Sequence, residues 1–196
     1  MMVVAVVVAF LCGSLPFSSW LAGLAGKDIR RIGDGNPGAS NVFHTGSRML
    51  GAAALLLDFF KAFVPVFVFL QVLRPVGAGL VLLAVAPVLG HAFMPWRGFK
   101  GGKGVNATFG IWTALSLWVV PASLGLVLAV LVLFFKKLPD AFKVMVGMAA
   151  VAPVLVWIGA PWEWWVVFVL NLLLLAYTHR RELTGGRVEG GGRDAS

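Results

Sequence analysis

Long runs of apolar residues, separated by short polar segments, dominate this chain. Seven of these runs are predicted to form helices, at residues 2–24, 49–70, 76–94, 105–118, 122–135, 141–158 and 162–177. The longest match the roughly 20 residues that a helix needs to cross the hydrocarbon core of a bilayer. The pattern therefore predicts an all-α, polytopic integral membrane protein with seven transmembrane helices.

The fourth and fifth predicted helices come from a single apolar stretch that is too long for one span. Pro121 interrupts this stretch, and proline disrupts a helix because it lacks a backbone N–H and crowds the preceding turn. We therefore expect two short helices, joined by a tight turn near this proline.

One membrane domain accounts for almost the whole chain. The polar segments are too short to hold a soluble domain, so residues 1–189 are predicted to form a single seven-helix domain, and residues 190–196 a disordered tail. The composition agrees, because 60% of the residues are hydrophobic and the mean hydropathy is +0.93, far above a soluble domain.

The basic residues predict the orientation in the membrane. With seven helices, the segments 25–48, 95–104 and 136–140 and the C-terminal tail share one side. With Lys143 at its edge, that side carries every Lys and Arg except Arg74 and the membrane-embedded Lys61. Cytoplasmic loops are enriched in Lys and Arg, so the N-terminus is expected outside and the C-terminus in the cytoplasm.

The net charge of +8 and the single cysteine narrow the chemistry. In a membrane protein, such a positive charge suits anionic lipids and anionic substrates, and we expect no nucleic-acid partner. Cys12 alone excludes an intrachain disulfide and a cysteine metal cluster, and the chain has neither an H-E-x-x-H motif nor a G-x-S-x-G motif. We therefore expect no metal and no cofactor.

A polar segment at residues 90–108, GHAFMPWRGFKGGKGVNAT, stands between two apolar runs and is called the glycine loop below. It combines His91, Lys100 and Lys103 with closely spaced glycines. Glycine lets backbone N–H groups approach an anion, and lysine supplies a compact positive charge, so the loop suits a phosphate. The alternative is a basic loop that contacts lipid headgroups.

Two more polar clusters belong to the same predicted face. One is GDGNPGASN at residues 33–41, called the first loop below, and the other is His-Arg-Arg at residues 179–181. Each alone is compatible with an ordinary turn or with a basic cap on the last span. Three such clusters on one membrane face favour a binding site.

Asp58 and Lys61 lie three residues apart in the second predicted span, so they share one face of the helix. Charged groups inside a membrane usually pair or line a cavity. Two interpretations remain open: a structural ion pair that orients this helix, or a pair whose lysine forms the floor of an anionic pocket.

Taken together, GDGNPGASN, the DFFK of residues 58–61, GHAF…FKGGKGV and the His-Arg after the last span resemble the acyl-phosphate-dependent glycerol-3-phosphate acyltransferases (PlsY). The resemblance covers nearly the whole chain and implies a multi-pass enzyme of the bacterial inner membrane, with its active site on the cytoplasmic face. It implies transfer of an acyl group from acyl phosphate to position 1 of sn-glycerol 3-phosphate, giving lysophosphatidic acid and phosphate. The implied partners are acyl phosphate, sn-glycerol 3-phosphate and membrane lipids.

The resemblance also implies roles for individual residues. Lys103 and His179 are the expected catalytic residues, with His179 assigned first to substrate binding because the departing phosphate can accept the proton. The other expected substrate- and phosphate-binding residues are Gly35, Asn36, Gly38, Ser40, Asn41, His44, Arg48, His91, Lys100, Gly101, Gly102 and Gly104. An acyl phosphate is already activated, so the site needs cations and N–H donors that hold two anions together rather than a covalent nucleophile.

The chain departs from the family pattern in its first and third motifs. Asp34 stands where the family usually has serine, and we expect Lys27, Arg30 or Arg31 to neutralise it. His44 stands where the family usually has arginine, and Arg48 is a candidate to replace that arginine. A non-catalytic or altered-specificity paralogue that binds phosphorylated metabolites or lipids therefore remains the alternative.

Overall fold

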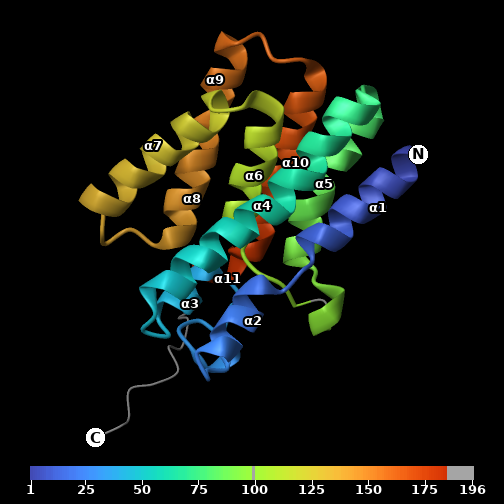
Figure 1. Cartoon of the computed structure of the whole chain (residues 1–196). Coiled ribbons are helices and arrows are strands. Elements are labelled where there is room, and N and C mark those ends of the chain that lie inside the picture. Colours follow the sequence, from blue (N-terminus) through green and yellow to red (C-terminus); the bar gives the residue numbers. More distant parts are fainter. Residues whose placement is uncertain (99, 185–196) are drawn as a thin grey trace, which may run out of the picture.

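The computed structural model of the protein describes residues 1–98 and 100–184. These residues form helices joined by turns and contain no strand, which confirms the predicted all-α fold (Figure 1). The predicted tail at 190–196 lies outside the described residues. The elements are α1 (Met2–Gly13), α2 (Phe17–Leu24), η1 (Ile29–Arg31), α3 (Ala39–Phe43), α4 (Arg48–Leu73), α5 (Gly77–Ala92), η2 (Pro95–Arg97), α6 (Val105–Ser116), α7 (Val119–Phe134), α8 (Asp140–Ala149), α9 (Val151–Trp157), α10 (Trp162–Thr178) and α11 (Arg180–Leu183).

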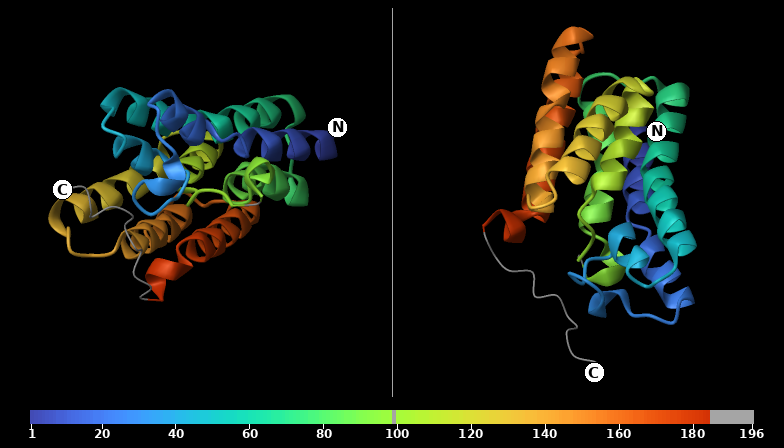
Figure 2. Two further views of the ribbon diagram at one scale, coloured as in Figure 1. Left: turned by 90° about the horizontal axis from the view of Figure 1, so that it is seen from below. Right: turned by 90° about the vertical axis from the view of Figure 1, so that its left-hand side faces the viewer.

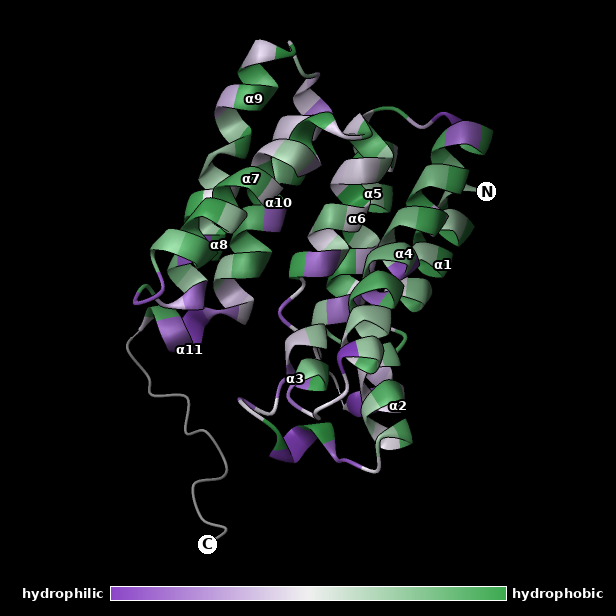
Figure 3. Cartoon of the chain, turned by 60° about the vertical axis from the view of Figure 1, so that its left-hand side comes forward, coloured by the Kyte–Doolittle hydropathy of each residue, from purple (hydrophilic) through white to green (hydrophobic). Residues whose placement is uncertain are grey.

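The longer helices run side by side, with the short helices α2, α3 and α11 gathered at one end of the bundle (Figures 1 and 2). Helix α4 packs against α6, and α5 packs against both α1 and α10. Four segments are long and apolar enough to cross a membrane, namely Met2–Leu24, Arg48–Leu73, Gly77–Arg97 and Asp140–Trp157. Apolar residues cover the helices, while hydrophilic residues concentrate towards the end that holds α3 and α11 (Figure 3).

Proline accompanies a helix break in the 105–135 stretch and in the predicted span 141–158, which is two helices, α8 and α9. Pro65 and Pro87, in contrast, lie inside the continuous helices α4 and α5. The ring of a proline clashes with the carbonyl of the residue four positions earlier. Pro121 and Pro153 stand in the first turns of α7 and α9, and the preceding helices end by Ser116 and Ala149. The break in the 105–135 stretch therefore lies at Leu117, where φ is +55°, and not at Pro121 itself.

The first predicted span is also two helices, because Pro16 lies between α1 and α2. The prediction of one continuous helix over residues 2–24 is wrong at this point. The break leaves the carbonyl of Leu15 outside any helical ladder, and Lys61 Nζ donates a hydrogen bond to it at 2.9 Å. A membrane-embedded cation thus satisfies a backbone acceptor that the proline has freed.

The Asp58–Lys61 pair fastens α4 to this break. Lys61 Nζ lies 2.7 Å from Asp58 Oδ1, and both side chains are almost completely buried. Ser18 on α2 donates a hydrogen bond of 2.9 Å to Asp58 Oδ2. Each charged group therefore has partners on the chain, as buried ions require. These contacts support the interpretation of a structural pair that orients α4.

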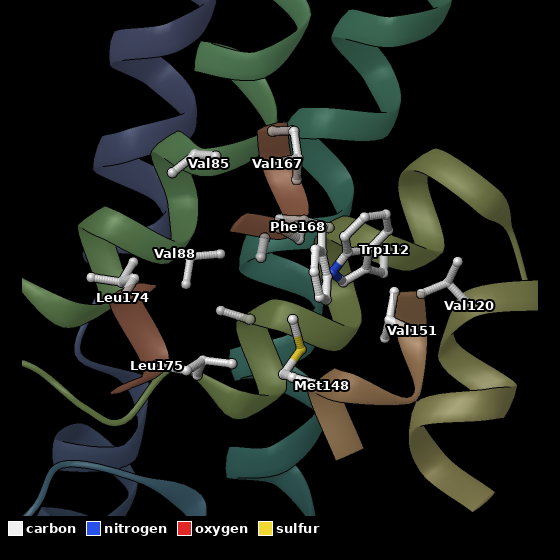
Figure 4. Close-up of a cluster of buried hydrophobic side chains, with 14 of the residues drawn as sticks. Val85, Val88, Trp112, Val120, Met148, Val151, Val167, Phe168, Leu174 and Leu175 are labelled. Atoms are coloured by element: carbon white, nitrogen blue, oxygen red, sulfur yellow. The ribbon is translucent and has the colours of Figure 1, made fainter. Parts of the chain in front are cut away.

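The main apolar core is built from buried residues of the seven helices α4 to α10, several of which are labelled in Figure 4. Trp112 on α6 is fully buried there, and its Nε1 donates to Asn171 Oδ1 on α10 at 3.2 Å. Asn171 Nδ2 in turn donates to Thr108 Oγ1 on α6 at 3.1 Å. Asn171 therefore joins two helices through polar contacts inside an apolar core, which holds α6 and the preceding glycine loop against α10.

Candidate active site

A pocket of about 390 Å³ opens at the end of the bundle where the short helices gather. The first loop supplies most of its wall, and the glycine loop, the start of α8 and α11 supply the rest. The lining residues are Gly33, Asp34, Asn36, Gly38, Ser40, Asn41, His44, Lys103, Pro139, Asp140 and Glu182. The fold thus brings the first loop, the glycine loop and the segment after α10 to one place. That segment contributes Glu182 to the lining, rather than the predicted cluster at residues 179–181.

Lys103 is held between two carboxylates of this pocket. Its Nζ lies 2.8 Å from Asp34 Oδ2 and also pairs with Glu182 Oε1. Burial alone would lower the pKa of Lys103, but its hydrogen bonds and its proximity to the two carboxylates outweigh burial and raise that pKa above its ordinary value. Lys103 is therefore a firmly protonated cation at neutral pH.

Asp34 receives three donors. Its Oδ2 pairs with Lys103, while its Oδ1 accepts hydrogen bonds from the Asn41 side-chain amide at 2.7 Å and from the Asn36 backbone N–H at 3.1 Å. Burial would raise the pKa of Asp34, but these three donors outweigh it and lower the pKa below its usual value. The carboxylate is therefore ionised at neutral pH.

The cation that neutralises Asp34 differs from the one predicted. Lys27, Arg30 and Arg31 were the expected partners, whereas the partner is Lys103. Arg30 instead pairs with Asp28 at 2.9 Å on the exposed side of η1. Because η1 is a single short turn, Arg30 reaches Asp28, two residues before it, more readily than Asp34, which lies beyond the following turn.

The glycine loop packs tightly against the end of α5. The N–H groups of Gly101 and Gly102 donate to the carbonyls of Ala92 and His91, at 3.1 and 2.9 Å. A Cβ atom at either glycine would overlap the backbone of α5 or the imidazole of His91. The expectation that these two amides bind a phosphate needs correction, because both are engaged in closing the C-terminus of α5. Glycine is required here for close approach, and the result is a fixed backbone at Lys103.

His179 lies at the end of α10 and is 2% exposed. Its Nδ1 lies 2.8 Å from the carbonyl oxygen of Leu175, which can only accept, so Nδ1 carries the proton and Nε2 is left as an acceptor. Burial lowers the pKa of His179 more than its hydrogen bond raises it, and the nearby charge of Lys103 lowers it further. The imidazole is therefore neutral at neutral pH.

The backbone of the glycine loop is also tied directly to α10. Thr178 Oγ1 donates a hydrogen bond of 2.9 Å to the carbonyl of Lys103. The catalytic candidates Lys103 and His179 are thus held by neighbouring contacts at the end of one helix.

A family model described as glycerol-3-phosphate acyltransferase matches residues 3–185. The chain belongs to this family. Glycerol-3-phosphate acyltransferase 1 of Thermotoga maritima is 36% identical over 91% of this chain and 94% of its own length. The glycerol-3-phosphate acyltransferase of Bradyrhizobium diazoefficiens is 36% identical over 92% of this chain and 88% of its own length.

Two solved structures share both the family and the fold. Both are crystal structures of PlsY (YgiH), described as an integral membrane glycerol 3-phosphate acyltransferase. The glycerol 3-phosphate form aligns with a TM-score of 0.83 and 31% identity over 94% of this chain and 93% of its own. The lysophosphatidic acid form aligns with a TM-score of 0.82 and 29% identity over the same shares. The chain is therefore a membrane protein of the PlsY family.

Of the residues expected in a family site, those of the first loop come together. The pocket is lined by Asn36, Gly38, Ser40, Asn41 and His44, and Gly35 lies within the same loop. His44 is exposed and is the C-cap of α3, whereas Ser47 caps the start of α4.

The remaining expected residues lie outside the lining, and these include the catalytic candidate His179 and the pair Gly101 and Gly102. Lys100 and Arg48 are exposed away from it, His91 is buried beneath the glycine loop, and Gly104 turns the chain into α6 with φ of +88°. Arg48 is not among the lining residues, and its replacement of the family's arginine stays a prediction.

Two carboxylates that line the pocket, those of Asp140 and Glu182, were not predicted as site residues from the sequence. Glu182 was part of an apparently basic segment, RREL, and Asp140 lay in a loop that offered no motif. Glu182 Oε2 accepts a hydrogen bond of 3.2 Å from the N–H of Ala141, at the start of α8. The signal available in the sequence was Glu182 itself, an acidic residue about one turn after the last predicted span. Carboxylates are favoured at helix N-termini, and here Glu182 meets the N-terminus of α8.

Proposed function

We propose that this protein transfers a fatty acyl group from an acyl phosphate to the 1-hydroxyl of sn-glycerol 3-phosphate. A C–O bond forms between that hydroxyl and the acyl carbon, and the bond between the acyl carbon and the phosphate oxygen breaks. Inorganic phosphate leaves with the hydroxyl proton, and lysophosphatidic acid is the product. Family membership supports glycerol 3-phosphate as the acceptor, and the motif resemblance supports acyl phosphate as the donor.

One observation carries the proposal. Lys103 of the glycine loop meets the amide donors of the first loop in a single pocket at the polar end of an apolar bundle. Such a place lets a charged head group enter from water while an acyl chain stays among apolar helices. The PlsY structure in its glycerol 3-phosphate form shares this fold over nearly the entire chain.

The chemistry that these residues supply is charge neutralisation and alignment. Two phosphate groups repel each other, and a fixed cation together with N–H donors offsets that repulsion without reorganising during the reaction. Lys103 has a backbone held by α5 and α10, so its ammonium group is positioned before substrate arrives. His179, neutral with a free Nε2, is suited to accept a hydrogen bond from a substrate hydroxyl.

A turnover assay on purified protein tests the proposal. Acyl phosphate and glycerol 3-phosphate should together release phosphate and form lysophosphatidic acid, and omitting either substrate should abolish the product. Binding of both substrates without any turnover would contradict the proposal and favour the alternative, a non-catalytic or altered-specificity paralogue.

We also infer that seven helices cross the bacterial inner membrane, with the N-terminus outside and the pocket on the cytoplasmic face. The start of α1 and the short helix α11 lie towards opposite ends of the bundle, and hydrophilic residues gather at the end that holds α3 and α11 (Figures 2 and 3). In a Cys12→Ala background, a cysteine replacing Ser196 should resist a membrane-impermeant maleimide on intact cells and react after permeabilisation. Labelling of that cysteine in intact cells would contradict the orientation.

A further inference from the structure

The pocket has an unusual charge balance for a site that takes anions. Three carboxylates line it, from Asp34, Asp140 and Glu182, and Lys103 is the one lysine or arginine among the described lining residues. Asp140 has a partner elsewhere, since Lys143 Nζ lies 2.9 Å from its Oδ1. Lys103, however, is shared by Asp34 and Glu182 and has no uncommitted charge for a substrate.

The groups around Asp34 form an anion-binding arrangement that is already filled. A cation contacts one carboxylate oxygen, and two N–H donors, from Asn36 and Asn41, contact the other. These are the donors that the first loop and the glycine loop would offer to a phosphate. The carboxylate of Asp34 therefore stands where an anionic oxygen of a ligand would make the same three contacts.

We propose that Asp34 is an internal anion that competes with the phosphate of glycerol 3-phosphate for Lys103, Asn36 and Asn41, and thereby sets the phosphate affinity of the site. The inference rests on the proposed function and adds a specificity-determining residue to it. Substrate binding exchanges one anion for another at Lys103, so the lysine keeps a negative partner in both states.

Asp34 is placed to move, whereas the other partner of Lys103 is not. Asp34 lies between Gly33 and Gly35, whose φ values are +56° and +70°, in a turn outside the helices, and its side chain is 22% exposed. Glu182 is anchored by a second hydrogen bond, from the N–H of Ala141 to its other oxygen. The geometry therefore points to Asp34 as the carboxylate that a phosphate displaces.

Calorimetric titration of the full chain in detergent tests this inference, with inorganic phosphate and glycerol 3-phosphate as separate probes. Asp34→Asn keeps the shape and the acceptor oxygen but removes the charge, and Asp34→Ser shortens the side chain. Each variant should bind both probes about five- to tenfold more tightly than wild type, the effect of removing one charged competitor. Asp28→Asn is the matched control, because Asp28 also pairs with a cation but lies outside the pocket, and it should leave both affinities unchanged.

The outcomes separate the inference from the proposed function. Unchanged or weaker phosphate binding in both folded Asp34 variants would overturn the inference, even if the enzyme turns over. Weaker binding of glycerol 3-phosphate alone would also overturn it, and would show that Asp34 contacts the glycerol hydroxyls instead. Tighter binding of both probes without any turnover would leave the inference standing and overturn the proposed function.

Discussion

Replacing Lys103 with alanine removes the cation that links the glycine loop to Asp34 of the first loop and to Glu182. In the ligand-free protein it leaves Asp34 and Glu182 facing each other without a positive charge between them. In the proposed reaction it removes the positive charge that would offset the repulsion between two phosphate groups. The same substitution therefore acts on stability and on catalysis, and the two effects differ in size.

The structure sets both magnitudes. The side chains of Asp34 and Glu182 are 22% and 15% exposed, so water screens each ion pair, and losing both should cost about 2 kcal/mol of unfolding free energy or less. Loss of one preorganised donor to the transition state costs about 2–4 kcal/mol, which lowers kcat/KM by about 30- to 1000-fold. Catalysis should therefore fall far more than stability.

Phosphate release from acyl phosphate and glycerol 3-phosphate, measured well below the unfolding temperature, checks this expectation. Thermal unfolding of the same samples shows that the variant is folded. Lys136→Ala is the control, because Lys136 is an exposed lysine on the same side of the chain that does not line the pocket. Lys103→Arg should recover only part of the activity, since its planar fork cannot reproduce the ammonium geometry. A Lys103→Ala enzyme whose kcat/KM stays within about threefold of wild type would refute the reasoning.

Gly102→Ala should lower the free energy of unfolding by about 1–3 kcal/mol and raise the activation barrier by a similar amount, because its Cβ would overlap the buried imidazole of His91. Gly125→Ala on α7 is the control and should be neutral or slightly stabilising. Equal effects of the two substitutions in thermal unfolding would contradict the packing argument. The pKa of Asp34 in the folded protein lies below its value in the unfolded chain, so its contribution to stability is complete above about pH 4 and is lost as pH falls further. The difference in unfolding free energy between wild type and Asp34→Asn, measured in detergent, should therefore shrink on acidification. A difference that stays constant down to about pH 2.5 would contradict this assignment of the Asp34 pKa. Turnover should persist in excess chelator and in Cys12→Ala, since neither a metal-ligand motif nor a pocket thiol is present among the residues described, and loss of turnover in either case would refute direct attack on the acyl phosphate.

The local pattern of the chain predicted the class of structure well. Apolar runs of helical length indicated an all-α membrane protein, because lipid-exposed backbone must satisfy its hydrogen bonds within the helix. The motifs around Asn36 and Lys103 indicated two loops of one site, and the pocket contains both residues. Some prolines also marked helix breaks, but the clash acts one turn earlier, so these breaks lie before Pro121 and Pro153. Pro65 and Pro87 lie inside continuous helices, so proline alone did not decide where a helix ends.

The use of each polar group was decided only by the tertiary structure. The sequence suggested that the backbone N–H groups of Gly101 and Gly102 are free to bind a phosphate. In the structure both donate hydrogen bonds to carbonyls at the end of α5. Lys103 looked like a free cation, yet it lies between Asp34 and Glu182, the latter 79 positions away in sequence. Helical periodicity and turn propensity depend on neighbouring residues, and therefore they can be predicted from a short stretch of sequence. Which donor meets which acceptor depends on how distant segments pack, and at this pocket that packing placed a carboxylate where the motifs suggested a phosphate.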